Sequence, residues 1–109
     1  MRDKIIIDKA KVINYLLNTN HPEGRSKALF FKYYGFYDEN PLLFQKAMKN
    51  HFYLNFNTVI NIETPYGTKI ILQGPIETPK GKKVLIKSIW FKELHSKCIK
   101  LVTAYPSND

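Results

Sequence analysis

The hydrophobic pattern changes its period part-way along the chain, and this change limits the fold more than any other feature. Up to about residue 55, apolar side chains recur every three or four positions, as they do on one face of a helix. From Phe56 onward they alternate, as on a strand. Helices that come first and strands that come last predict an α+β domain rather than alternating β-α-β units.

The first half of the chain predicts about three short helices. Asp8 is a good N-cap for the first, Gly35 suits the left-handed residue that ends the second, and Pro41 fits the first position of the third. His51 ends the apolar stripe of the third helix, a position typical of a half-buried core or capping histidine. The predicted helices span residues 9–17, 26–34 and 41–52.

The second half predicts four strands joined by links short enough for antiparallel hairpins. These strands span residues 57–63, 68–73, 82–91 and 98–105. We therefore expect a four-stranded antiparallel sheet with the N-terminal helices packed on one face and the other face partly open.

Strict alternation in residues 82–91 separates two rows of side chains, and both rows are mostly apolar. This pattern is typical of a central strand covered on both sides along much of its length, with Lys87 or Ser88 as the polar exception. One row holds Val84, Ile86, Ser88 and Trp90, and the other holds Leu85, Lys87, Ile89 and Phe91.

The chain is strongly basic, with 17 Lys and Arg residues against nine Asp and Glu, a formal net charge of +8. Such an excess attracts polyanions, RNA first among them. The alternative is that most of these lysines only keep the surface solvated.

The length of 109 residues suits a single domain, 1–109. No apolar run reaches the roughly 18 residues of a membrane span, and the N-terminus does not resemble a signal peptide. The lone Cys98 excludes an internal disulfide. We therefore expect a cytoplasmic protein without a membrane partner, and no motif for a metal or another cofactor occurs.

The segment from His21 to Lys27 is the strongest candidate site. Gly24 and Lys27 stand at the opening of the second predicted helix, where free backbone amides, the helix dipole and a cationic side chain all attract anions. Histidine titrates near neutrality, so His21 is a candidate general acid or base. The alternative is a plain turn, in which Gly24 permits the bend and Lys27 is solvated.

The predicted sheet adds further candidates. Lys69 begins the second strand and would lie beside Lys87 if the two strands are neighbours, which would make a cationic face. Thr103 and Tyr105 share a row of the last strand and place two hydroxyls at its end, although simple edge packing explains them equally. Metal-independent RNA cleavage needs a base, an acid and cations, and His, Lys, Tyr and Thr can fill these roles.

Several segments together resemble a family of uncharacterised bacterial domains, found as small stand-alone proteins and at the C-terminal tips of secreted polymorphic toxins. Where that family often has Arg-Thr before the tryptophan, this chain has Lys87 and Ser88, so a phosphate clamp there would be weaker. The resembling segments are Asn14-Tyr15-Leu16-Leu17-Asn18, His21-Pro22-x-Gly24-x-Ser26-Lys27-Ala28-x-Phe30-Phe31, Tyr34-Gly35-Phe36, Tyr66-Gly67-Thr68-Lys69, Gly74-Pro75, Trp90 and Leu101 to Pro106.

The resemblance implies a toxin domain with a cognate acidic antitoxin or immunity protein. The predicted order of helices and strands is also similar to ribonuclease toxins of the barnase, EndoU and RelE type, a fold analogy. Carried over position by position, the family pattern points to His21, Gly24, Lys27, Lys69, Lys87, Trp90, Thr103 and Tyr105.

Our leading hypothesis is therefore a bacterial toxin that cleaves RNA without a metal, with His21 as general acid or base. Lys27, Lys69 and Lys87 would be the phosphate-binding cations, and Thr103 and Tyr105 would position the substrate. One alternative is a non-enzymatic RNA-binding or antitoxin-like protein with a basic surface. Another is a domain that binds an acidic protein partner.

Overall fold

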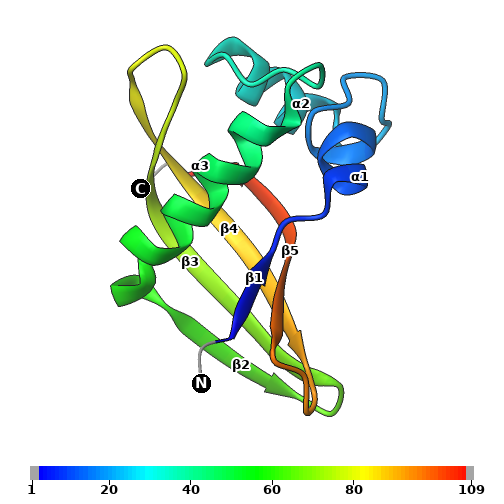
Figure 1. Ribbon diagram of the computed structural model, residues 1–109, viewed down its shortest axis with the longest axis vertical. Coiled ribbons are helices and arrows are strands. Elements are labelled where there is room, and N and C mark those ends of the chain that lie inside the picture. The colour runs from blue at the N-terminus through cyan, green and yellow to red at the C-terminus, as the bar shows by residue number, and fades with distance from the viewer. Residues whose placement is uncertain (1–2, 108–109) are drawn as a thin grey trace.

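The computed structural model describes residues 3–107 and contains one five-stranded sheet with the strand order β1-β5-β4-β3-β2 (Figure 1). β2 to β5 follow one another as an antiparallel meander, as the alternating second half of the sequence predicts. The strands are β1 (Lys4–Ile6), β2 (Ile60–Thr64), β3 (Gly67–Glu77), β4 (Lys83–Glu93) and β5 (Cys98–Pro106).

The prediction of four antiparallel strands is wrong in one respect, because β1 adds a fifth strand that runs parallel to β5. Ile5 lies opposite Ile99 in this pair. A three-residue strand has too few positions to show a period of two, and it is stabilised by pairing with a segment more than 90 residues away. The α+β class is confirmed, and the sheet is mixed rather than purely antiparallel.

The helices are α1 (Lys9–Lys11), which continues into the π-helix η1 (Val12–Leu16), α2 (Arg25–Tyr33) and α3 (Pro41–Leu54), followed by the 3-10 turn η2 (Phe56–Thr58). The side chain of Asp8 accepts a hydrogen bond from the amide of Ala10, which confirms it as the N-cap of α1. Gly35 ends α2 with a φ of 102°. No helix among residues 3–107 is long and apolar enough to cross a membrane.

The core lies between the helices and one face of the sheet. α3 lies across this face, whereas α1, η1 and α2 gather beside the C-terminal half of β5 (Figure 1). Helices and sheet share one continuous hydrophobic cluster, as the first row of the alternating pattern in β4 predicts. Its fully buried members include Leu16, Phe31, Phe44, Met48, Leu72, Ile86 and Trp90.

The opposite face of the sheet, here called the outer face, is only partly covered. β4 is a central strand, as expected, but Leu85 on its outer face is 45% exposed, so this strand is not covered on both sides along its length. Side chains of Cα partners on neighbouring strands point to the same face. The register therefore places Lys87, Gln73 and Tyr105 in one row across the outer face.

A polar network is buried under α3. His51 and Ser88 are both fully buried, and His51 Nε2 lies 2.8 Å from Ser88 Oγ, which also accepts a hydrogen bond from the indole N–H of Trp90 at 2.9 Å. On the other side of the ring, Asn55 donates to the carbonyl oxygen of Pro75 at 3.0 Å. A histidine beside a serine can suggest a catalytic pair, but full burial makes this one part of the core, as the sequence predicts for His51.

Burial lowers the pKa of His51 below its ordinary value of 6.5, and a hydrogen bond with the Pro75 carbonyl only partly opposes this effect. As the pH falls below about 6.5, the unfolded chain therefore binds a proton that the folded protein does not, and stability is lost. We expect the melting temperature to fall between about pH 7.5 and pH 5.5 more steeply in the wild type than in His51→Gln.

The matched control for this experiment is His95→Asn, which removes an exposed histidine whose φ of 65° asparagine tolerates. This variant should keep the wild-type pH dependence. Equal slopes for the wild type and His51→Gln would show that His51 does not control stability in this range.

Candidate functional site

The loop that precedes α2 is held together by His21. Its Nδ1 accepts hydrogen bonds from the backbone amides of Glu23, at 3.1 Å, and Gly24, at 3.0 Å. With the Nδ1 lone pair used in this way, the ring proton of the neutral form lies on Nε2. His21 therefore holds the turn that leads into α2 and presents an N–H donor, which makes it a poor general base in this conformation.

Gly24 brings this loop against η1. A Cβ at this position would lie 3.0 Å from both the ring and the backbone oxygen of Tyr15, so a larger residue would push the loop away. The ring of His21 packs edge-on against the ring of Tyr15, with centroids 4.9 Å apart. The sequence offered a plain turn and a candidate site as alternatives for this segment. The structure combines them, because the turn at Gly24 holds the loop against the ring of Tyr15.

Tyr15 stands at the centre of the site. Its hydroxyl accepts a hydrogen bond from Lys27 Nζ at 3.0 Å and lies 3.2 Å from Thr103 Oγ1. Burial raises the pKa of Tyr15, but the hydrogen bonds from Lys27 and Thr103 and the positive charge of Lys27 outweigh burial and leave the pKa below its usual value of 10.0. A phenol with a lowered pKa beside an ammonium group is suited to proton transfer.

Lys27 also faces the last strand. Its Nζ lies 5.7 Å from the ring centroid of Tyr105 and 5.5 Å from that of Tyr15, both within the range of a cation–π contact. A solvent-open hollow adjoins this cation and is lined by Ser26, Lys27, Tyr105 and Pro106. An anion can therefore reach Lys27 from the outside.

The structure brings four of the six predicted site residues together around one residue that the sequence analysis did not select. We call this group the Tyr15 cluster; it comprises Tyr15, His21, Lys27, Thr103 and Tyr105. Its members come from η1, the following loop, α2 and β5. Tyr15 belongs to the resembling segment Asn14 to Asn18, but its place between the buried positions Val12 and Leu16 of a helical stripe gives no sign of a role in the site.

The two remaining candidates, Lys87 and Lys69, lie on the outer face at different distances from the cluster. Lys87 is the Cα partner of Tyr105 and therefore its neighbour. Lys69 is the partner of Phe91, four residues further along β4, which is about 13 Å along the strand. The expectation that Lys69 lies beside Lys87 is therefore not met, because the register places Gln73 opposite Lys87.

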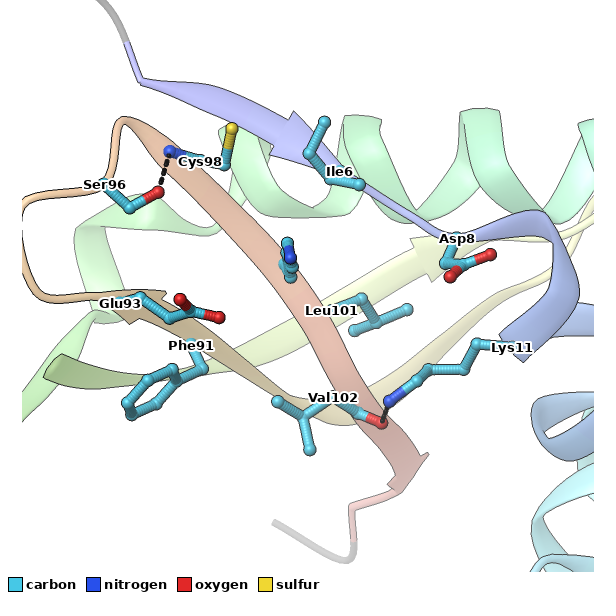
Figure 2. Close-up of a pocket in the computed structure, with 10 residues that line it drawn as sticks. Ile6, Asp8, Lys11, Phe91, Glu93, Ser96, Cys98, Leu101 and Val102 are labelled. Carbon is cyan, nitrogen blue, oxygen red and sulfur yellow. Dashed lines mark hydrogen bonds between the residues drawn. The ribbon is translucent and has the colours of Figure 1, made fainter. Parts of the chain in front are cut away.

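A second hollow on the outer face lies between β4, β5 and the start of α1 (Figure 2). Lys11 Nζ donates to the carbonyl oxygen of Val102 there at 3.3 Å, and Asp8 is the N-cap of α1. Side chains of both charges line it, including Glu93 and Lys100. Since Asp8 and Lys11 are already used by the fold, the Tyr15 cluster is the better candidate for chemistry.

Comparison with known proteins places the chain in a family. The family model described as "Domain of unknown function (DUF6883)" matches residues 2–108. The chain belongs to this family. No curated protein matches this DUF6883 domain.

One solved structure similar to this DUF6883 domain is a chain from the "Contact-dependent growth inhibition toxin - immunity protein complex from Klebsiella pneumoniae 342". The TM-score is 0.74, the sequence identity is 17%, and the match covers 95% of this chain and 94% of the other. At this identity the similarity shows a shared fold over nearly the whole length of both chains.

Proposed function

We propose that this DUF6883 domain is a toxin-type ribonuclease that cleaves RNA without a metal ion. The observation that carries the proposal is the hydrogen bond from the Lys27 ammonium to the Tyr15 hydroxyl, whose pKa is lowered, next to a hollow open to solvent. This pair supplies a proton acceptor, a proton donor and a cation in one place, the three requirements of phosphodiester transesterification.

In the proposed reaction, the ionised Tyr15 takes the proton of the ribose 2′-hydroxyl, and the 2′-oxygen forms a bond to phosphorus. Lys27 stabilises the negative charge on the phosphate oxygens and gives a proton to the departing 5′-oxygen as its bond to phosphorus breaks. The hydrogen bond between Tyr15 and Lys27 then returns the proton from the phenol to the amine. The products are a 2′,3′-cyclic phosphate and a 5′-hydroxyl.

The other members of the cluster have supporting roles in this proposal. Thr103 holds the Tyr15 hydroxyl, and Tyr105 offers a ring on which a base can stack. His21 is not the general base in this proposal. It holds the loop in place through Nδ1, and its Nε2–H can donate a hydrogen bond to the substrate.

The toxin part of the proposal is supported by fold and charge. The similar solved chain comes from a complex of a toxin with its immunity protein, and a net charge of +8 suits a protein that acts on RNA. A cognate acidic protein that covers the basic surface is the expected partner. The second candidate, a non-enzymatic RNA-binding protein, is favoured by the same charge and differs in leaving RNA intact.

The experiment that tests the proposal is incubation of the purified protein with total RNA in EDTA, followed by sequencing of new ends. We expect new 5′-hydroxyl ends at defined sites. Intact RNA that remains bound to the protein would instead establish the non-enzymatic alternative. Cleavage that requires an added divalent metal would contradict the proposed chemistry.

The positions of Lys87 and Lys69 predict unequal effects on RNA cleavage. Lys87 adjoins Tyr105, so Lys87→Ala should raise KM for RNA about 3- to 10-fold. The slope of log K for RNA binding against log salt concentration should also fall by about one, the value of one lost phosphate contact. Lys69→Ala removes the same charge from the same face at a greater distance, and serves as the matched control. Equal KM values for the two variants would show that the row of Lys87 and Tyr105 does not contact RNA near the cleaved bond.

A further inference from the structure

The turn between β3 and β4 carries two lysines, Lys80 and Lys82, and is held in one conformation by hydrogen bonds. The hydroxyl of Thr78 donates to the carbonyl oxygen of Lys82 at 2.6 Å, and the backbone amide of Thr78 donates to the same oxygen at 3.1 Å. Gly81 donates its amide to the carbonyl oxygen of Thr78 at 2.9 Å. The turn is therefore an ordered platform for its lysine side chains.

This turn packs against the end of α2. A Cβ at Gly35 would lie 3.1 Å from the Cβ of Pro79 and 3.3 Å from the Cγ of Lys80, so the absence of a side chain at Gly35 permits the close approach. Two segments more than 40 residues apart in the chain therefore form one surface. The side chains of Pro79 and Lys80 pack against the backbone of Gly35 at this contact.

The packing places a cation on an exposed aromatic ring. Lys80 Nζ lies 5.6 Å from the ring centroid of Tyr33, which is 70% exposed, and Tyr34 packs edge-on behind it with centroids 4.9 Å apart. We call this group the Tyr33 surface; it comprises Tyr33, Tyr34, Lys80 and Lys82, which together line a hollow.

The charge of the Tyr33 surface is available to a ligand. In the part of the chain that the structure describes, neither Lys80 nor Lys82 forms an ion pair, whereas Lys32 nearby on α2 is paired with Asp38 at 3.3 Å. An exposed ring beside unpaired lysines is the combination that binds single-stranded nucleic acid, because bases stack on the ring and phosphates contact the cations.

We propose that the Tyr33 surface binds a single-stranded segment of RNA, with a base stacked on Tyr33 and phosphates at Lys80 and Lys82. Tyr33 and Lys27 belong to the same helix, six residues or about 9 Å apart along its axis and about 120° apart around it. An RNA strand that contacts both the Tyr15 cluster and this surface would therefore cross α2 obliquely. The role as a second contact for the cleaved RNA rests on the proposed function, whereas the binding itself does not.

The test is fluorescence anisotropy with a labelled, single-stranded 2′-O-methyl RNA of about twelve nucleotides, a length within the range of known single-strand sites. This probe lacks the 2′-hydroxyl nucleophile, so it reports binding whether or not the protein cleaves RNA. Tyr33→Ala should raise Kd about tenfold, since the loss of one stacked base is large. Tyr33→Phe should bind as the wild type does, because it keeps the ring.

The matched control is Tyr66→Ala, which removes a tyrosine that is 80% exposed in the turn between β2 and β3. Tyr66→Ala should leave Kd unchanged, and equal Kd values for Tyr33→Ala and Tyr66→Ala would overturn the proposal. A loss of binding in Lys80→Ala/Lys82→Ala without an effect of Tyr33→Ala would overturn the stacking contact. Binding that depends on Tyr33 in a protein that leaves RNA intact in EDTA would refute the proposed ribonuclease and retain this inference.

Discussion

Replacing Tyr15 with phenylalanine should lower the rate of RNA cleavage about 100-fold or more, which is the usual loss when a general acid or base is removed. The change deletes one oxygen atom, the one that lies 3.0 Å from Lys27 Nζ and 3.2 Å from Thr103 Oγ1. Loss of these part-buried hydrogen bonds costs only about 1 kcal/mol each, so the protein should remain folded.

The pH profile separates a role in catalysis from a structural role. In the wild type, kcat should rise with pH toward the pKa of Tyr15, which is lowered from 10.0, because only the ionised phenol accepts the 2′-proton. This rise should be absent in Tyr15→Phe. A residual activity that keeps the wild-type pH profile would assign the proton transfer to another group.

Tyr53→Phe is the matched control for Tyr15→Phe. It removes the same atom from a ring that is 50% exposed on α3. We expect no change in kcat for this variant. Lys27→Ala should lose as much activity as Tyr15→Phe, and the double variant should lose little more, because the two groups act as one unit.

Replacing Gly74 with alanine should lower the free energy of unfolding by about 3 kcal/mol or more, through overpacking and broken buried hydrogen bonds. A Cβ at Gly74 would overlap the side-chain amide of Asn55. That amide donates to the carbonyl oxygens of His51 and Pro75, both at 3.0 Å. The melting temperature should therefore fall by more than about 10 °C.

Two further variants test whether the collision with Asn55 causes the loss of stability in Gly74→Ala. Gly81→Ala places a Cβ in open space at a φ of 83°, so it should cost only the roughly 1–2 kcal/mol of a left-handed residue. Asn55→Ala removes the group with which the new methyl collides, so Gly74→Ala/Asn55→Ala should cost less than the sum of the single changes. Strict additivity would show that the collision with Asn55 is not the source of the loss.

The resemblance that the sequence suggested is consistent with the family found. The residue types in the segment from His21 to Lys27 attract anions and predict a site there, and the segment does contribute His21 and Lys27 to the Tyr15 cluster. Residue type alone suggests a general acid or base for His21. The hydrogen bonds that occupy Nδ1 depend on loop geometry, and no spacing in the sequence reveals them.

The positions of Lys69 and Lys87 show the limit of strand-level prediction. Alternation placed both residues on strands, and both do lie on the outer face. Their separation depends on the register between β3 and β4, since a shift by a few residues moves one lysine along the sheet without changing either strand. Only the paired structure determines which lysine adjoins Tyr105.

The sequence by itself determined the order of helices before strands, the antiparallel meander and the net charge of +8, because period, turn residues and composition can be read without the fold. The tertiary structure alone decided that a three-residue strand pairs in parallel with β5, and that Tyr15 lies between Lys27 and Thr103. Thr103 and Tyr15 are 88 positions apart in the chain. Contacts of that range form through packing of the whole core, which no local pattern encodes.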